Sequence, residues 1–97
     1  MTVGVIGGGA WGTALAQTVA GGGEPAMLWA REAEVVATIA ERRENSLFLP
    51  GISLHPDVAA TSRLGDLAGC DLLLVATPAQ HLRGVLAEAP GRGVPLV

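Results

Sequence analysis

Short apolar runs alternate along this chain with longer segments in which apolar residues recur every three or four positions. Uniformly apolar runs are typical of strands buried on both faces, and the longer period is typical of helices buried on one face. The runs that we predict as strands are residues 2–6, 25–29, 58–61, 72–76 and 94–97. Residues 58–61 form the weakest of these runs, whereas residues 72–76 are apolar enough to be buried on both faces.

The periodic segments predict helices over residues 10–20 and 32–43, a short helix before residue 72 and a further helix from Thr77. Glycines 21–23 are expected to end the first helix. The residues expected to face inward are Trp11, Leu15 and Val19 in the first helix, and Val35, Val36, Ile39 and Ala40 in the second. Residues 45–57 contain two prolines and predict a loop.

Six consecutive residues after the first predicted strand read Gly-Gly-Gly-Ala-Trp-Gly and fit G-x-G-x-x-G through Gly7, Gly9 and Gly12. A strand before the motif and a helix after it distinguish a dinucleotide-binding turn from a chance cluster of glycines. Gly7 allows a sharp turn, Gly9 allows the backbone to approach a pyrophosphate, and Gly12 allows close helix packing. Backbone N–H groups at the helix start, around Ala10 and Trp11, would then face the phosphates. The alternative is a tight turn that binds no ligand.

Strands that alternate with helices, with this turn after the first strand, predict an α/β fold. We expect a Rossmann-type, doubly wound parallel sheet in three layers. The 97 residues suffice for a single domain. Because the last predicted strand is followed by no helix, we expect residues 1–97 to be the N-terminal, NAD(P)-binding domain of a longer protein.

The end of the second predicted strand bears on which dinucleotide binds. An acidic residue there binds the ribose 2′-hydroxyl of NAD, and an arginine accommodates the 2′-phosphate of NADP. Arg31 comes first, with a guanidinium suited to a phosphate, and Glu32 follows at the start of the next helix. The pair favours NADP(H) and leaves NAD(H) open, and a merely solvated Arg31 is the alternative.

Thr77 and Pro78 follow the fourth predicted strand, at the edge where the ligand crevice of such a sheet forms. Thr77 and Gln80 have the spacing of a capping box, which explains them without a ligand. Pro78 suits the first position of a helix and is also expected beside the nicotinamide. Trp11 either covers the cofactor or anchors the first helix in the core.

No catalytic or metal-binding residue is predicted. His55 lies between loop residues and His81 near a helix start, and neither has a carboxylate placed beside it in the sequence. The aspartates at positions 57, 66 and 71 lack the spacing of metal ligands.

Composition excludes several classes of function. The net charge is −3 and the six basic residues are scattered arginines, so nucleic acid is not an expected partner. No apolar run reaches the roughly 20 residues that a membrane-spanning helix needs, and the N-terminus does not resemble a signal peptide. Cys70 is the only cysteine, which fits a reducing cytoplasm.

Nearly the whole chain resembles the N-terminal domain of bacterial NAD(P)-dependent glycerol-3-phosphate dehydrogenases. The matching stretches are residues 5–16 (Val-Ile-Gly-Gly-Gly-Ala-Trp-Gly-Thr-Ala-Leu-Ala), 28–31 (Leu-Trp-Ala-Arg), 44–52 (Glu-Asn-Ser-Leu-Phe-Leu-Pro-Gly-Ile) and 75–80 (Val-Ala-Thr-Pro-Ala-Gln). Many dehydrogenases share the first stretch, and its combination with the second and third is more specific.

The resemblance implies an oxidoreductase that interconverts dihydroxyacetone phosphate and sn-glycerol 3-phosphate by hydride transfer, in glycerophospholipid synthesis. It also implies cofactor contacts at Ala10, Trp11, Arg31 and Phe48. The family usually has serine at position 10 and often tyrosine at position 48, so two side-chain hydroxyl contacts would be absent here. Some members carry a basic residue in place of Glu32, which weakens the preference for NADP.

The family's catalytic lysines are expected after the last predicted strand and in a helical C-terminal domain, together with the site for the substrate phosphate. This chain has no lysine, so we expect it to bind cofactor without turnover. A homodimer is possible through the surface that the second domain would cover. The alternatives are another reductase, such as a hydroxyacid dehydrogenase or ketopantoate reductase, and a non-catalytic nucleotide-binding domain.

Overall fold

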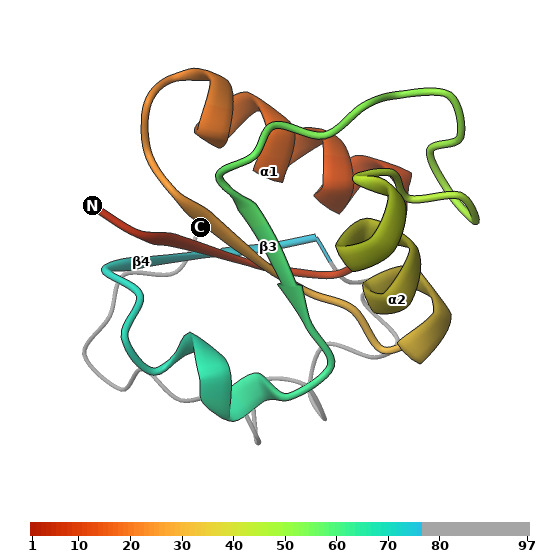
Figure 1. Cartoon of the computed structure of the whole chain (residues 1–97). Coiled ribbons are helices and arrows are strands. Elements are labelled where there is room, and N and C mark those ends of the chain that lie inside the picture. Colours follow the sequence, from red (N-terminus) through yellow and green to blue (C-terminus); the bar gives the residue numbers. More distant parts are fainter. Residues whose placement is uncertain (77–97) are drawn as a thin grey trace.

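The computed structural model describes residues 1–76. Four parallel strands form one sheet in the order β3-β2-β1-β4 (Figure 1). The strands are β1 (Val3–Ile6), β2 (Ala26–Trp29), β3 (Val58–Thr61) and β4 (Leu72–Val75). The helices are α1 (Ala10–Gly21), α2 (Ala33–Arg42) and the short 3-10 helix η1 (Leu64–Leu67). The predicted helix from Thr77 and the predicted strand 94–97 lie outside the described residues.

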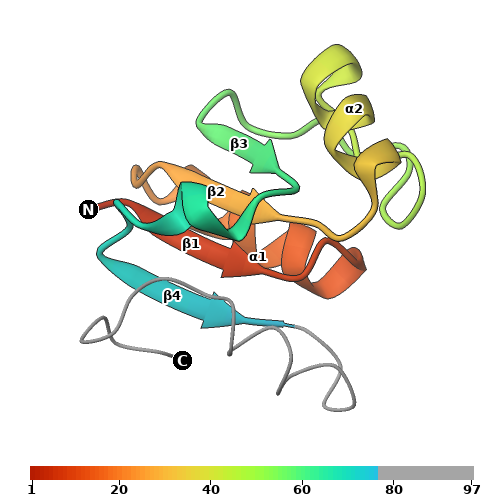
Figure 2. The same ribbon diagram turned by 90° about the horizontal axis from the view of Figure 1, so that it is seen from below.

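The helices lie on both faces of the sheet. α1 and α2 cover one face and η1 lies on the other (Figures 1 and 2). The α/β prediction of a Rossmann-type parallel sheet in three layers is therefore confirmed. The strand bounds agree with the predicted runs to within one residue, and those of β3 agree fully.

The strands end together at one edge of the sheet. Ile6 pairs with Trp29 on one side and with Val75 on the other, and Trp29 pairs with Thr61. The chain order runs to β2 and β3 on one side of β1 and jumps to β4 on the other. A ligand crevice is expected outside the carboxyl ends of the strands at such a reversal.

Side chains alternate between two hydrophobic cores, one on each face, because successive strand residues point to opposite faces. Val3 and Val5 of β1 belong to the core beneath α1 and α2, whereas Ile6 belongs to the core beside η1. The η1 core also contains Trp29 and Leu73. The two cores explain why the strands read as continuous apolar runs.

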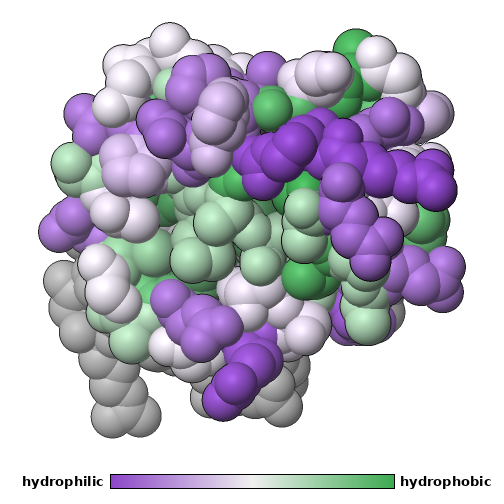
Figure 3. All heavy atoms as spheres, viewed as in Figure 1, coloured by the Kyte–Doolittle hydropathy of each residue, from purple (hydrophilic) through white to green (hydrophobic). Residues whose placement is uncertain are grey.

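The outer strands of the described sheet are less buried than its centre. In β4 only Leu73 is fully buried, so the prediction that this run is buried on both faces is wrong for its other residues. β4 has a described strand on one side only, and its Leu72, Leu74 and Val75 are half-buried. β3 also has one described neighbour, and its Ala59 is exposed. Figure 3 shows a small hydrophobic area over β3 with hydrophilic residues around it.

α1 packs through a different face from the predicted one. Its fully buried residues are Gly12, Thr13, Ala16 and Ala20, and Trp11 is 68% exposed. Leu15 and Val19 are half-buried against the core. The prediction of a Trp11-led inward face is therefore wrong at its first residue. Small residues face the sheet because α1 lies close to β1 and β2, and a large side chain would hold it away.

α2 follows its predicted pattern with one exception. Val35 and Ile39 are fully buried, Val36 is half-buried, and Ala40 is exposed rather than inward-facing. Glu32 and Arg43 are the residues that flank the helix, and Arg43 adopts a left-handed conformation with φ of 53°.

Residues 45–57 form the predicted loop, with one isolated bridge between Asn45 and Leu49. The loop passes beside α1 before it enters β3 (Figure 1). The Gln17 amide of α1 binds this loop, since it accepts a hydrogen bond from the backbone N–H of His55 at 2.7 Å. It also donates one to the carbonyl of Ser53 at 3.4 Å.

Candidate functional site

A cavity of about 350 Å³ opens at the carboxyl edge of the sheet, beside the reversal in strand order. This volume is within the usual range for small-molecule sites. The glycine turn, the end of β2 and the loop after α2 supply its walls. The lining residues are Gly7, Gly8, Gly9, Ala10, Trp11, Gly12, Trp29, Arg31, Glu32, Phe48 and Ala76.

Seven of the eight residues predicted for the cofactor site line this cavity: Gly7, Gly9, Ala10, Trp11, Gly12, Arg31 and Phe48. They come from three segments that are well separated in the sequence, so the fold brings them together. The eighth, Pro78, lies outside the described residues.

The glycine turn is shaped by backbone constraints. Gly7 has φ of 128°, a conformation that side-chain-bearing residues rarely adopt, and its N–H donates to the carbonyl of Trp29 at 2.9 Å. A Cβ atom on Gly12 would overlap the carbonyl oxygen of Gly7, so α1 packs here at a distance that only glycine permits. A Cβ on Gly9 would meet nothing within 4 Å, which leaves open space at the cavity wall.

The start of α1 presents hydrogen-bond donors at this wall. The first intrahelical bond runs from the N–H of Thr13 to the carbonyl of Gly9 at 3.0 Å. The N–H groups of Ala10, Trp11 and Gly12 therefore precede the helical ladder and have no partner within it. No side chain caps this end of the helix and no acidic residue lies in its first turn. The wall suits an anion, because the helix dipole adds positive potential to these donors.

The end of β2 brings opposite charges to the same cavity. Arg31 is exposed and Glu32 is half-buried as the residue before α2. Neither side chain forms an ion pair within residues 1–76. The guanidinium can donate to a phosphate and the carboxylate can accept from a ribose hydroxyl, so this wall carries groups suited to either dinucleotide.

Aromatic side chains form the apolar part of the lining. Trp11, from the start of α1, and Phe48, from the loop after α2, line the cavity and are 68% and 41% exposed. For Trp11, the structure therefore contradicts the core-anchor alternative. Trp29 is buried at the base, and its indole Nε1 has no hydrogen-bond partner within the described part of the chain.

Sequence reasoning missed Gly8, Thr13 and Asn45 as contributors to the site. A Cβ on Gly8 would overlap that of Ala30, so this position needs glycine although the motif leaves it variable. Asn45 and Thr13 are fully buried polar residues that bind the glycine turn. A lone asparagine between α2 and a Leu-Phe-Leu run was the available signal, and nothing local to it indicates its distant partners.

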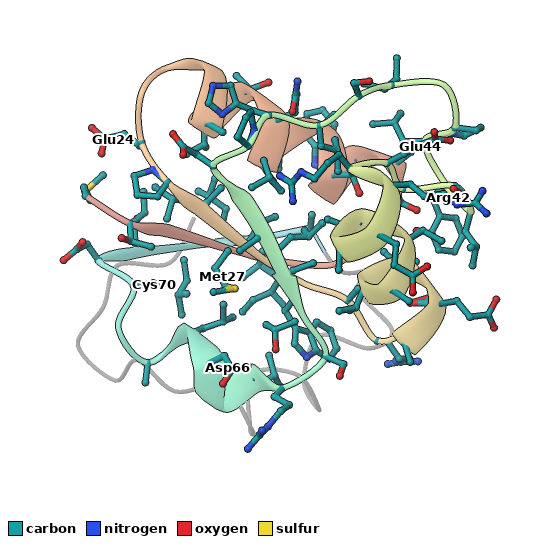
Figure 4. The ribbon with its side chains drawn as sticks, in the orientation of Figure 1. Glu24, Met27, Arg42, Glu44, Asp66 and Cys70 are labelled. Atoms are coloured by element: carbon teal, nitrogen blue, oxygen red, sulfur yellow. The ribbon has the colours of Figure 1, made fainter. Side chains whose placement is uncertain are left out.

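Other chemistry-bearing residues lie away from the cavity. The imidazole Nδ1 of His55 lies 3.8 Å from the carboxylate of Asp57, so His55 does have a carboxylate neighbour, on the surface. Cys70 is buried beside η1, where Met27 also packs (Figure 4), and burial raises the pKa of its thiol. Within residues 1–76, no three His, Cys, Asp or Glu side chains gather where they would hold a metal ion. The described helices are too short or too polar to cross a membrane.

Comparison with known proteins identifies the family. Residues 2–93 match the family described as the N-terminus of NAD-dependent glycerol-3-phosphate dehydrogenase. The chain is 57% identical over 98 residues to a glycerol-3-phosphate dehydrogenase [NAD(P)+] of Caulobacter vibrioides, covering 98% of this chain and 30% of that protein.

Solved structures agree with this match. The glycerol-3-phosphate dehydrogenase of Saccharomyces cerevisiae is 29% identical with a TM-score of 0.83, over 90% of this chain and 29% of that one. The Coxiella burnetii enzyme, at 23% identity, shares the fold with a TM-score of 0.89, over 98% of this chain and 30% of that one. The chain thus spans under a third of the length of these proteins. It belongs to the glycerol-3-phosphate dehydrogenase N-terminal family.

Proposed function

We propose that residues 1–97 are the cofactor-binding domain of an NAD(P)-dependent glycerol-3-phosphate dehydrogenase. The whole protein would interconvert dihydroxyacetone phosphate and sn-glycerol 3-phosphate in glycerophospholipid synthesis. The observation that carries the proposal is the cavity where the glycine turn, the start of α1 and the end of β2 meet. The homodimer and the cytoplasmic location predicted from the sequence stay predictions.

The cavity lining suits a nicotinamide dinucleotide. The N–H groups at the start of α1 would bind the pyrophosphate, with Gly9 leaving space for its approach. Arg31 and Glu32 would contact the adenosine ribose or its 2′-phosphate, and Trp11 and Phe48 would pack against the apolar parts. When bound, the nicotinamide supplies the hydride acceptor or donor. This chain's residues would bind and orient it, and Pro78 is proposed beside it.

The proposal is tested by titrating the chain with NADPH and NADH, followed by calorimetry. We expect NADPH to bind more tightly, and Arg31→Ala to weaken NADPH about tenfold or more while NADH changes little. Glu32→Gln should strengthen NADPH binding, because it removes a negative charge from the wall that would hold the 2′-phosphate. Arg42→Ala is the matched control, since Arg42 is exposed at the opposite end of α2 (Figure 4).

An unchanged ratio of NADPH to NADH affinity in Arg31→Ala would contradict the assignment of the 2′-phosphate to Arg31. Failure of wild type to bind either dinucleotide would contradict the cofactor proposal itself.

The activity proposed for the whole protein needs a separate experiment. The chain is put in place of the matching N-terminal part of the Caulobacter vibrioides relative, and reduction of dihydroxyacetone phosphate is followed by loss of NADPH. We expect the chimera to turn over and the isolated chain to bind cofactor without turnover. Oxidation of glycerol 3-phosphate by the isolated chain would contradict the expectation that this chain binds cofactor without turnover. A folded chimera that binds cofactor but never turns over would instead favour a non-catalytic nucleotide-binding domain.

A further inference from the structure

A fully buried amide lies between two walls of the candidate site. The side chain of Asn45 has no exposed surface, and its Nδ2 group donates to the carbonyl of Gly8 and to Oγ1 of Thr13, both at 2.8 Å. Its Oδ1 accepts from the backbone N–H of Phe48 at 3.2 Å. Both amide hydrogens and the amide oxygen are therefore paired. Only an amide of this length offers two donors on one side and an acceptor on the other.

Thr13 extends this network to the next peptide unit of the turn. Its hydroxyl donates to the carbonyl of Gly9 at 2.8 Å and lies 3.5 Å from the carbonyl of Gly8. Since the same oxygen accepts from Asn45, the hydroxyl proton is directed to the glycine carbonyls. Thr13, like Asn45, is fully buried and does not line the cavity.

Fixing these two carbonyls also fixes two donors. A peptide unit is planar and trans, so its C=O and the following N–H point in opposite directions. The carbonyl of Gly8 shares its plane with the N–H of Gly9, and that of Gly9 shares its plane with the N–H of Ala10. The Asn45 amide holds the Gly8 carbonyl, and the Thr13 hydroxyl holds the Gly9 carbonyl together with the Thr13 backbone N–H, so these hydrogen bonds set the directions of both N–H groups. A flexible run of three glycines has no side chains with which to do this itself.

The other end of the network orders the loop after α2, which supplies Phe48 to the cavity. The carbonyl of Asn45 accepts from the N–H of Leu49 at 2.9 Å, beside the bond from Phe48 to Oδ1. Together they close the turn that places Phe48 at the cavity. Asn45 thus connects the glycine turn to the loop that carries Phe48.

We infer that Asn45 and Thr13 are positioning residues that orient the N–H donors of Gly9 and Ala10 toward the pyrophosphate of the dinucleotide. This role rests on the proposed cofactor function. It assigns the affinity of the site partly to residues that never touch the ligand.

The test is a titration with NADPH, and with NADH as a second probe, followed by amide NMR on Thr13→Val. Valine keeps the shape of threonine and removes the hydroxyl. We expect NADPH affinity to fall about tenfold, with reduced ligand-induced shifts at Gly9 and Ala10. The shifts at Arg31 and Glu32 at saturation should persist. Thr13→Ser, which keeps the hydroxyl, should restore most of the affinity.

Thr18→Val is the matched control. Thr18 lies on the same helix and donates to the carbonyl four residues earlier, Ala14, at 2.9 Å, but away from the glycine turn. The Thr18→Val variant should leave the affinity for NADPH unchanged. Asn45→Asp keeps the acceptor for the N–H of Phe48 but replaces the Nδ2 donor with a carboxylate oxygen, which would face the carbonyl oxygen of Gly8 and Oγ1 of Thr13. This variant should lose more NADPH affinity than Thr13→Val or fail to fold.

An unchanged NADPH affinity in Thr13→Val would overturn the positioning role, as would an equal loss of ligand-induced shifts at all four residues. In both cases binding by wild type would leave the proposed function standing. Failure of wild type to bind either dinucleotide would overturn the proposed function and the positioning role together.

Discussion

The two walls of the cavity are built in opposite ways. In the glycine turn, residues 7–12, close backbone approach and a positive φ decide which positions must be glycine, and the side chains of Asn45 and Thr13 bind two of its carbonyls. The loop after α2, residues 43–57, which supplies Phe48 to the cavity, is held by polar side chains that reach distant backbone groups, chiefly those of Arg43, Asn45 and Gln17. Steric exclusion limits a position to one residue type, whereas hydrogen bonding depends on where the partner lies. The motif glycines of the first wall are therefore recognisable in the sequence, whereas the hydrogen bonds that hold the second are not.

Gly12→Ala is expected to have the largest effect on stability. The added Cβ would overlap the carbonyl oxygen of Gly7, which is backbone and cannot rotate away, so α1 must shift from the sheet. We expect a loss of more than about 3 kcal/mol in unfolding free energy, measured by urea denaturation. Gly21→Ala, at the exposed end of the same helix where a Cβ meets nothing within 4 Å, is the control and should change little. Similar stability of the two variants would contradict the steric account of this wall.

The same contrast explains how far the sequence predicts this structure. Strand and helix bounds follow from apolar periodicity, and the carboxyl-edge site follows from the glycine motif placed after a strand. Trp11 was misjudged because spacing identifies residues that share a face and does not say whether that face meets the sheet. Gly8 was missed because its need for glycine comes from Ala30, 22 positions away, whose closeness exists only in the folded chain. Asn45 was missed for the same reason, since its partners on the turn lie 37 and 32 residues away.

Arg43→Ala is expected to have an intermediate effect on stability, through the loop after α2. The guanidinium of Arg43 donates to the carbonyls of His55 and Val58 and so closes the loop at its far end. Alanine keeps the Cβ and therefore the cost of the left-handed φ, so the change reports the hydrogen bonds and the packing of the side-chain stem. Loss of both bonds to a half-buried cation should cost about 1–3 kcal/mol in unfolding free energy.

The neighbouring residue provides the control for this prediction. Arg42→Ala removes an exposed arginine that has no described hydrogen bond or ion pair, and it should cost less than about 0.5 kcal/mol. Amide hydrogen exchange at Leu54 and Val58 should rise in Arg43→Ala alone, because their N–H groups bond within the closed loop. Equal exchange in the two variants would show that the loop is held without the guanidinium.

Gly9→Ala is expected to have the smallest effect on stability. It tests whether the glycines of the motif serve the fold or the ligand. Its Cβ meets nothing within 4 Å and its φ of −73° is open to alanine, so the unfolding free energy should fall by less than about 1 kcal/mol. The affinity for NADPH should nevertheless fall at least about tenfold, because the methyl group would occupy the space through which the pyrophosphate approaches. Calorimetric titration beside urea denaturation measures both quantities. Full affinity in Gly9→Ala would mean that no phosphate approaches this turn, and the glycine at position 9 would then need a different explanation from the one at position 12. Loss of NADPH affinity without loss of stability would establish that two glycines of one motif are required for different reasons. Gly12 would be required for helix packing and Gly9 for ligand binding.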